Sequence, residues 1–168
     1  MRRNVFWAVL VAATALIQTT WLGAVRIQGA LPDLTLLLVI YFALRDGEER
    51  AMWTGVIGGL FQDVAGNAVL GHNILCNVVI GYVVARVCQR LITDHHAVRV
   101  VLVILACLAR GLLYTLAFYI QNPDLAAVHH IIVTVVPGAF YTAVCALFLF
   151  PVLDRPSVRQ ALVKGEAL

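Results

Sequence analysis

Two ionisable residues, Asp63 and Arg110, lie deep inside apolar stretches and are the first candidates for chemistry in this sequence. If those stretches cross a membrane, each charge lies about twelve residues, or roughly 18 Å, from the same side. A lone charge near the middle of a bilayer costs about 2.5–3.5 kcal/mol, so each one needs a partner. We predict an Asp63–Arg110 ion pair between two helices. The alternative is that backbone carbonyls, Gln62, Asn67 or Asn73 satisfy each charge separately.

The same acid could instead carry a proton or an ion through the membrane. A carrier usually has several intramembrane acids in series along its path. This sequence offers Asp63 at depth and Asp33 nearer the outside. We therefore favour a structural clamp over an ion-coupled carrier.

The remaining polar residues do not form a pattern that is typical of catalysis or of a cofactor site. The sequence has no phosphate-binding glycine loop, no nucleophile beside a base and no carboxylate pair in a polar loop. Its four cysteines lie in apolar runs without a CxxC pair, and its paired histidines lie in turns, so no metal site is indicated. We expect no enzymatic activity, no cofactor and no nucleic-acid partner.

The composition indicates what must position these residues. The chain has 168 residues, of which 62% are hydrophobic and 12% charged, and its mean hydropathy is +0.92. Soluble domains carry roughly 25% charged residues, and a soluble fold of this size could not bury so much apolar surface. Lipid can solvate it, so the chain is expected to be an integral membrane protein.

The apolar stretches predict an all-α, polytopic membrane bundle of six transmembrane helices. A spanning helix needs roughly 20 residues, so this length accommodates about six helices with short connections. We place them at about 4–25, 31–45, 50–65, 70–91, 98–120 and 129–151. Residues 1–152 would then form the transmembrane domain, and 153–168 a short cytoplasmic tail.

The positive residues predict the orientation of this bundle. In the six-helix arrangement, ten Arg and Lys residues fall on the side of the N-terminus and only Arg26 falls opposite, with Arg110 inside a helix. Positive residues are enriched in cytoplasmic loops of membrane proteins. Both termini are therefore expected in the cytoplasm.

Small residues provide candidate packing surfaces. Gly55 and Gly59 form a GxxxG motif, and Ala8 and Ala12 give the first helix a similar small-residue face. Such residues let another helix approach closely, either inside the bundle or from a partner. We take Gly55, Gly58 and Gly59 as the candidate surface for a partner helix.

A series of short motifs resembles a known family in order and spacing. The series consists of Pro32-Asp33-Leu34, Tyr41, Leu44-Arg45 with Gly47, Gly55, Gly58-Gly59-Leu60, Asp63, Gly66, Leu70-Gly71, and Tyr82 with Arg86. Together with the length and the six spans, it resembles the rod shape-determining protein MreD family. Gln62 departs from the family, which more often has an apolar residue before the acid.

The resemblance implies a non-enzymatic scaffold in the bacterial cytoplasmic membrane. Such proteins bind MreC, and through it connect to MreB, to RodA and to its transpeptidase partner, which maintains rod shape and organises peptidoglycan synthesis. The family's fold is similar to the substrate-binding subunits of energy-coupling-factor transporters. That similarity provides the alternative, a membrane subunit that binds a small, vitamin-type molecule. Membrane lipid would surround either protein.

Overall fold

The computed structural model describes residues 2–20, 32–65, 70–90, 96–121 and 131–154, and within them the chain is helical without strands. The helices are α1 (Arg2–Thr20), α2 (Leu34–Arg45), α3 (Glu48–Ala65), α4 (His72–Cys88), α5 (His96–Gln121) and α7 (Val136–Leu153), with the short π-helix η2 (Ile131–Val135) leading into α7. The prediction of an all-α fold with six helices is confirmed. The predicted end of the first helix, at residue 25, lies outside the described residues.

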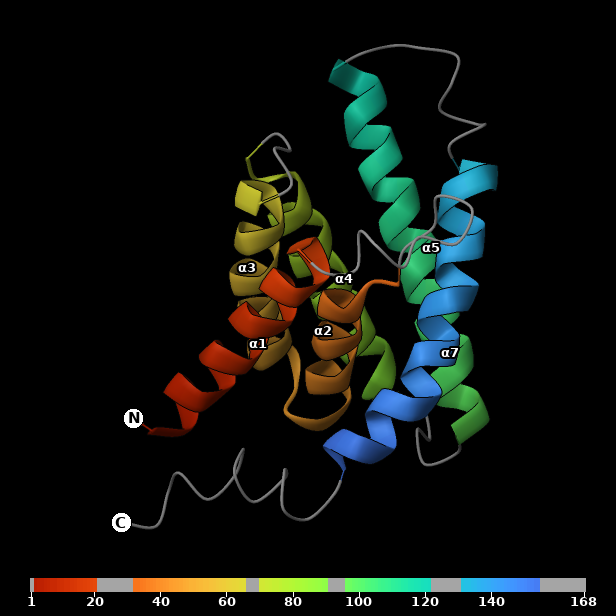
Figure 1. Ribbon diagram of the computed structural model, residues 1–168. Coiled ribbons are helices and arrows are strands. Elements are labelled where there is room, and N and C mark those ends of the chain that lie inside the picture. The colour runs from red at the N-terminus through yellow and green to blue at the C-terminus, as the bar shows by residue number, and fades with distance from the viewer. Residues whose placement is uncertain (1, 21–31, 66–69, 91–95, 122–130, 155–168) are drawn as a thin grey trace.

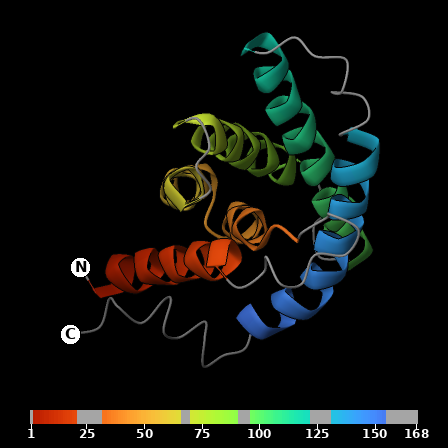
Figure 2. The ribbon, with the colours of Figure 1, turned by 45° about the horizontal axis from the view of Figure 1, so that its top comes forward.

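Helix α2 is the centre of the bundle. It contacts each of the other five helices, and all its residues from Thr35 to Ala43 are buried. Figure 2 shows α2 enclosed by α1, α3, α4, α5 and α7. A helix that is apolar on every side needs such surroundings, because it has no polar face for water. With 12 residues, α2 is about 18 Å long, and its beginning, at Asp33, lies beside residues well inside α5 and α7.

The three glycines of α3 pack inside the bundle rather than on its surface. A Cβ added at Gly55 would lie 2.9 Å from the backbone of Asn77, and one at Gly59 would lie 2.6 Å from the backbone of Ile74. Gly58 faces the side chain of Thr35 on α2. The interpretation of these glycines as a surface for a partner helix is therefore corrected. Their missing side chains let α3 lie directly against α4 and α2.

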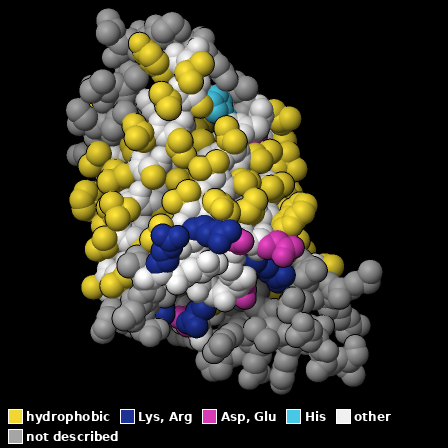
Figure 3. Space-filling model, turned by 180° about the vertical axis from the view of Figure 1, so that it is seen from behind, with side chains coloured by type: hydrophobic (Ala, Val, Ile, Leu, Met, Phe, Trp, Pro, Cys, Tyr) yellow, Lys and Arg dark blue, Asp and Glu magenta, His cyan; other side chains and the backbone are white. Residues whose placement is uncertain are grey.

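Two helical segments are long and apolar enough to cross a membrane, residues 97–117 and 133–153, among the residues that the structure describes. Only 33% and 28% of their most apolar windows are buried, so they are unlike the core helices of a soluble protein. The other apolar helices, over 5–20, 34–45 and 72–88, are shorter. In Figure 3, hydrophobic side chains spread over most of one face, and Arg, Asp and Glu side chains gather in a band toward one end.

The beginning of α1 and the end of α7 lie at the same end of the bundle (Figure 1). There the carboxylate of Asp154 accepts hydrogen bonds from Arg45 at 2.6 Å, from Arg99 at 3.4 Å and from the Tyr41 hydroxyl at 3.2 Å. At the same end, Arg86 forms an ion pair with Glu48 at 2.8 Å. These contacts join the ends of α2, α5 and α7, and the end of α4 to the start of α3. The family-motif positions Arg45 and Arg86 are thus partners in ion pairs.

The packing predicts that Gly59→Leu destabilises the protein. The added side chain would meet the backbone of Ile74, and overpacking of this kind costs about 1–3 kcal/mol or more. We expect a lower melting temperature of the detergent-solubilised protein, measured by intrinsic fluorescence. Val64→Leu, at an exposed position of the same helix, is the control and should leave the melting temperature unchanged. Equal melting temperatures for the two variants would show that Gly59 has room for a side chain.

Candidate functional site

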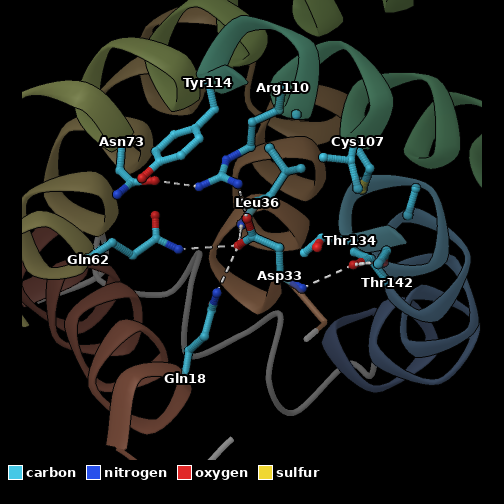
Figure 4. Close-up of a pocket in the computed structure, with 14 residues that line it drawn as sticks. Gln18, Asp33, Leu36, Gln62, Asn73, Cys107, Arg110, Tyr114, Thr134 and Thr142 are labelled. Carbon is cyan, nitrogen blue, oxygen red and sulfur yellow. Dashed lines mark hydrogen bonds and ion pairs between the residues drawn. The ribbon is translucent and has the colours of Figure 1, made fainter. Parts of the chain in front are cut away.

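A cluster of polar side chains lies beside the beginning of α2, and Asp33 is at its centre (Figure 4). Asp33 is the N-cap of α2, and its Oδ1 atom accepts a hydrogen bond from the backbone N–H of Leu36 at 3.0 Å. The same oxygen accepts amide N–H groups from Gln18 of α1 at 3.2 Å and from Gln62 of α3 at 3.3 Å. A carboxylate at a helix N-terminus is stabilised by the orphan N–H groups and the positive end of the helix dipole.

Asp33 also connects α2 to α5 and α7. Its Oδ2 atom forms an ion pair with the guanidinium of Arg110 on α5, at 2.9 Å. Its backbone N–H donates to the Thr142 hydroxyl on α7, at 3.0 Å. The side chains of Asp33 and Arg110 are 14% and 17% exposed, so this ion pair is largely shielded from solvent. One residue therefore makes polar contacts with four other helices.

Arg110 has further partners on α4. Its Nε–H donates to Asn77 Oδ1 at 2.7 Å, and one N–H of its second terminal nitrogen donates to Asn73 Oδ1 at 2.7 Å. Asn77 in turn donates from its amide nitrogen to Gln62 Oε1 at 2.9 Å. These bonds hold the flat guanidinium between α2 and α4. A buried charge is tolerated when its hydrogen-bonding groups are satisfied in this way.

Asp63 is almost completely buried, with 1% of its surface exposed, and it caps the beginning of α4. Its Oδ2 atom accepts the backbone N–H groups of Gly71 at 2.8 Å and Ile74 at 3.4 Å. Its Oδ1 atom accepts both the backbone and the side-chain N–H of Asn73, at 3.0 and 2.9 Å. The N-terminus of α4 therefore satisfies this carboxylate without a cation.

The predicted Asp63–Arg110 ion pair is corrected by these contacts. Both side chains do reach one cluster, and Asn73 links them, because its amide nitrogen donates to Asp63 and its oxygen accepts from Arg110. The ion pair of Arg110 is formed with Asp33 instead. The physical reason is that the short α2 begins at the depth of Arg110, while Asp63 points to the free N–H groups of α4.

Among the residues that the structure describes, the other predicted motif positions have backbone or packing roles. Gly71 has φ +99° at the start of α4, a conformation that side chains rarely adopt and that glycine adopts freely. Pro32 is buried and precedes the N-cap of α2. Gly66 and Asn67 lie outside the described residues.

Sequence reasoning missed four polar members of the cluster: Gln18, Thr35, Asn77 and Thr142. The Oε1 atom of Gln18 accepts both the backbone N–H and the hydroxyl of Thr35, each at 2.9 Å. Each of these residues lies in a predominantly apolar helix. That context was the available signal, because polar residues in apolar helices usually face the bundle interior.

A cavity of about 320 Å³ adjoins the cluster. Its polar lining residues are Gln18, Asp33, Gln62, Asn73, Arg110, Tyr114, Thr134 and Thr142. Its apolar lining residues are Leu36, Cys107, Gly111, Val135, Gly138 and Ala139. Among the described residues, no three His, Cys, Asp or Glu side chains lie close enough to hold a metal ion. The arrangement can hold a polar group by hydrogen bonds.

A family model described as rod shape-determining protein MreD matches residues 1–155, which is most of the chain. The chain belongs to the MreD family. MreD is a family of membrane proteins that determine rod shape, and it is not known as an enzyme family. The suspected family is therefore confirmed. The chain matches no curated protein and no solved structure, so the likeness to energy-coupling-factor subunits stays a prediction.

The geometry of this MreD protein predicts which acid is coupled to Arg110. Side chains in direct contact show coupling energies of about 0.5–3 kcal/mol in double-mutant cycles. We expect coupling in this range between Asp33→Asn and Arg110→Gln, measured as the free energy of unfolding in mixed micelles. Asp63→Asn should couple to Arg110→Gln more weakly, because Asn73 lies between the two side chains. Stronger coupling of Arg110 to Asp63 than to Asp33 would contradict this assignment.

Proposed function

We propose that this MreD protein is a non-enzymatic scaffold of the bacterial cell-elongation machinery and that it binds MreC within the membrane. Family membership supports a role in rod shape. The charged groups of the buried cluster are satisfied by ion pairs and hydrogen bonds within the protein, which suits a structural role. A scaffold requires a surface on which a partner helix can pack, and needs no reactive group.

The observation that carries this proposal is an apolar groove between α1 and α3. Val5, Ala8, Val9 and Ala12 line it from α1, and Ile57 and Phe61 line it from α3. Val5 and Val9 are 61% and 59% exposed, so this face is uncovered in the described chain. Ala8 and Ala12 are one helical turn apart, which lets a further helix approach the backbone closely. A single-span protein such as MreC would fit this groove with its membrane helix.

Direct contacts join the two helices that line the groove, α1 and α3. The indole N–H of Trp7 donates to the Thr54 hydroxyl at 3.0 Å, and the Arg50 guanidinium lies 4.7 Å from the centre of the Trp7 ring. Trp7 itself is buried, with 8% of its surface exposed. The groove is therefore preformed, and a partner helix would lose little free energy in ordering it.

Binding of MreC would connect the protein to the other components of the elongation machinery. Through MreC the protein would reach MreB, RodA and the transpeptidase partner of RodA, and so help to organise peptidoglycan synthesis. We place it in the bacterial cytoplasmic membrane with both termini in the cytoplasm. Arg45 and Arg99 both pair with Asp154, and Figure 3 shows Arg side chains gathered toward one end of the bundle, which supports this orientation. Residues 1–152 would form the membrane domain and 153–168 the cytoplasmic tail.

A substrate-binding subunit of an energy-coupling-factor transporter is the alternative that the sequence left open. The comparisons give it no support, since the matching family is one of shape determination. We do not propose it.

The groove predicts that Ala12→Leu weakens MreC binding. The larger side chain would fill the space that a partner helix needs, and we expect at least a tenfold loss of MreC recovered with the tagged protein from detergent-solubilised membranes. Rod-shaped cells that depend on the variant should become round. The control is Ala13→Leu, because Ala13 is exposed on the same helix and does not line the groove.

The melting temperatures of both variants decide how the result is interpreted. Loss of MreC with Ala12→Leu at an unchanged melting temperature supports the groove as the binding surface. Full recovery of MreC with a folded Ala12→Leu protein would place the partner elsewhere. Equal loss with both variants would also contradict a specific surface at the groove.

A further inference from the structure

Hydrogen-bond donors remain unused around the cavity beside Asp33. Arg110 uses three of its five N–H groups on Asp33, Asn73 and Asn77. The hydroxyls of Tyr114 and Thr134 line the same cavity, and neither has a hydrogen-bond partner among the described residues. A molecule in the cavity could therefore accept hydrogen bonds from the guanidinium. It could also donate hydrogen bonds to the two hydroxyls or accept hydrogen bonds from them.

The charges around the cavity are already balanced. Arg110 is neutralised by Asp33 at 2.9 Å, and Asp63 is satisfied by four N–H groups at the start of α4. An anion in the cavity would meet no unpaired cation among the residues that the structure describes, and two carboxylates lie nearby. A cation would compete with Arg110 for Asp33. The cavity therefore favours an uncharged occupant.

Polar and apolar side chains both line the cavity (Figure 4). The amides and the Arg110 guanidinium lie on one side, and the hydroxyls of Thr134 and Thr142 lie on the other, beside Cys107. Small residues of α5 and α7, among them Gly111, Gly138 and Ala139, complete the lining. The Tyr114 ring lies on the side of the amides, packed against His72 with ring centres 5.4 Å apart. A sugar ring has hydroxyl groups along its edge and a C–H face that packs on apolar or aromatic surface. The volume of about 320 Å³ lies at the low end for small-molecule sites and suits a single ring.

We propose that this cavity binds an uncharged polyhydroxyl group of the size of a sugar ring. Arg110, Tyr114 and Thr134 would donate to its oxygens, and the small residues of α5 and α7 would cover its apolar face. The group comes either from the headgroup of a glycolipid or from a free sugar, since both present the same chemistry to the cavity. Neither source depends on the proposed binding of MreC, because the groove for MreC lies on α1 and α3.

The test uses the full chain in nanodiscs of phosphatidylethanolamine and phosphatidylglycerol, prepared without a glycoside detergent. One arm dopes the discs with monoglucosyl diacylglycerol, with plain diacylglycerol as its control. The other arm adds methyl glucoside to undoped discs. Native mass spectrometry counts the bound molecules. The shift in melting temperature, measured at increasing probe concentration, shows whether binding saturates. We expect one saturable site for the glucosyl group in at least one arm, and the arm that responds identifies the source.

Two pairs of variants connect binding to the cavity. Thr134→Phe fills the cavity and should reduce affinity at least tenfold, whereas Val133→Phe, at the exposed neighbouring residue, should not. Tyr114→Phe removes one donor while keeping the ring and should reduce affinity about 2- to 10-fold. Its control is Tyr119→Phe, on an exposed residue of the same helix.

Several results would overturn the proposal. These are the absence of saturable binding in both arms, equal affinity of the Thr134→Phe and Val133→Phe proteins, or Thr134-dependent binding of phosphatidylglycerol in preference to the glucosyl probe. If the Thr134→Phe protein does not fold, the Tyr114 and Tyr119 pair decides by itself, and equal affinities of those two variants would exclude the cavity as the site.

Discussion

The position of one carboxylate, Asp33, constrains the whole bundle. Its side chain must be satisfied where little water is available, and it takes N–H groups from α2 itself, from Gln18, from Gln62 and from Arg110. Its backbone N–H binds Thr142. Five helices, α1, α2, α3, α5 and α7, are therefore connected through one residue. Because removing one partner of a buried ion pair costs about 3–5 kcal/mol, the arrangement tolerates little displacement of any of them.

This constraint explains why a 12-residue helix lies at the centre. A longer α2 would carry Asp33 away from the depth of Arg110, and a polar α2 could not be buried on all sides. The glycines of α3 contribute to the same polar cluster, because they let α4 lie close enough for Asn73 and Asn77 to reach the Arg110 guanidinium. The polar cluster and the close packing of α3 on α4 thus depend on each other. The outer surfaces of α1, α5 and α7 carry exposed hydrophobic side chains.

The sequence was sufficient to predict the six helices, because each apolar run ends in polar or turn-forming residues. It was also sufficient to predict that Arg110 needs a partner, since the depth of a charge follows from its place in a helix. Which residue pairs with Arg110 could be determined only from the folded structure. Sequence distance gives the depth of Asp63, but it does not show that the side chain turns toward the free N–H groups of α4. Likewise, the spacing of Gly55 and Gly59 shows that they share one face, and only the packing shows that this face meets α4 rather than a partner.

Electron cryomicroscopy of the protein with MreC in lipid nanodiscs would test these contacts most directly. The Arg110 guanidinium should lie within hydrogen-bonding distance of Asp33, Asn73 and Asn77, with Asp63 at the start of α4 and the MreC helix on the α1–α3 groove. An Arg110 paired with Asp63, with Asp33 turned to solvent, would contradict the central role of Asp33.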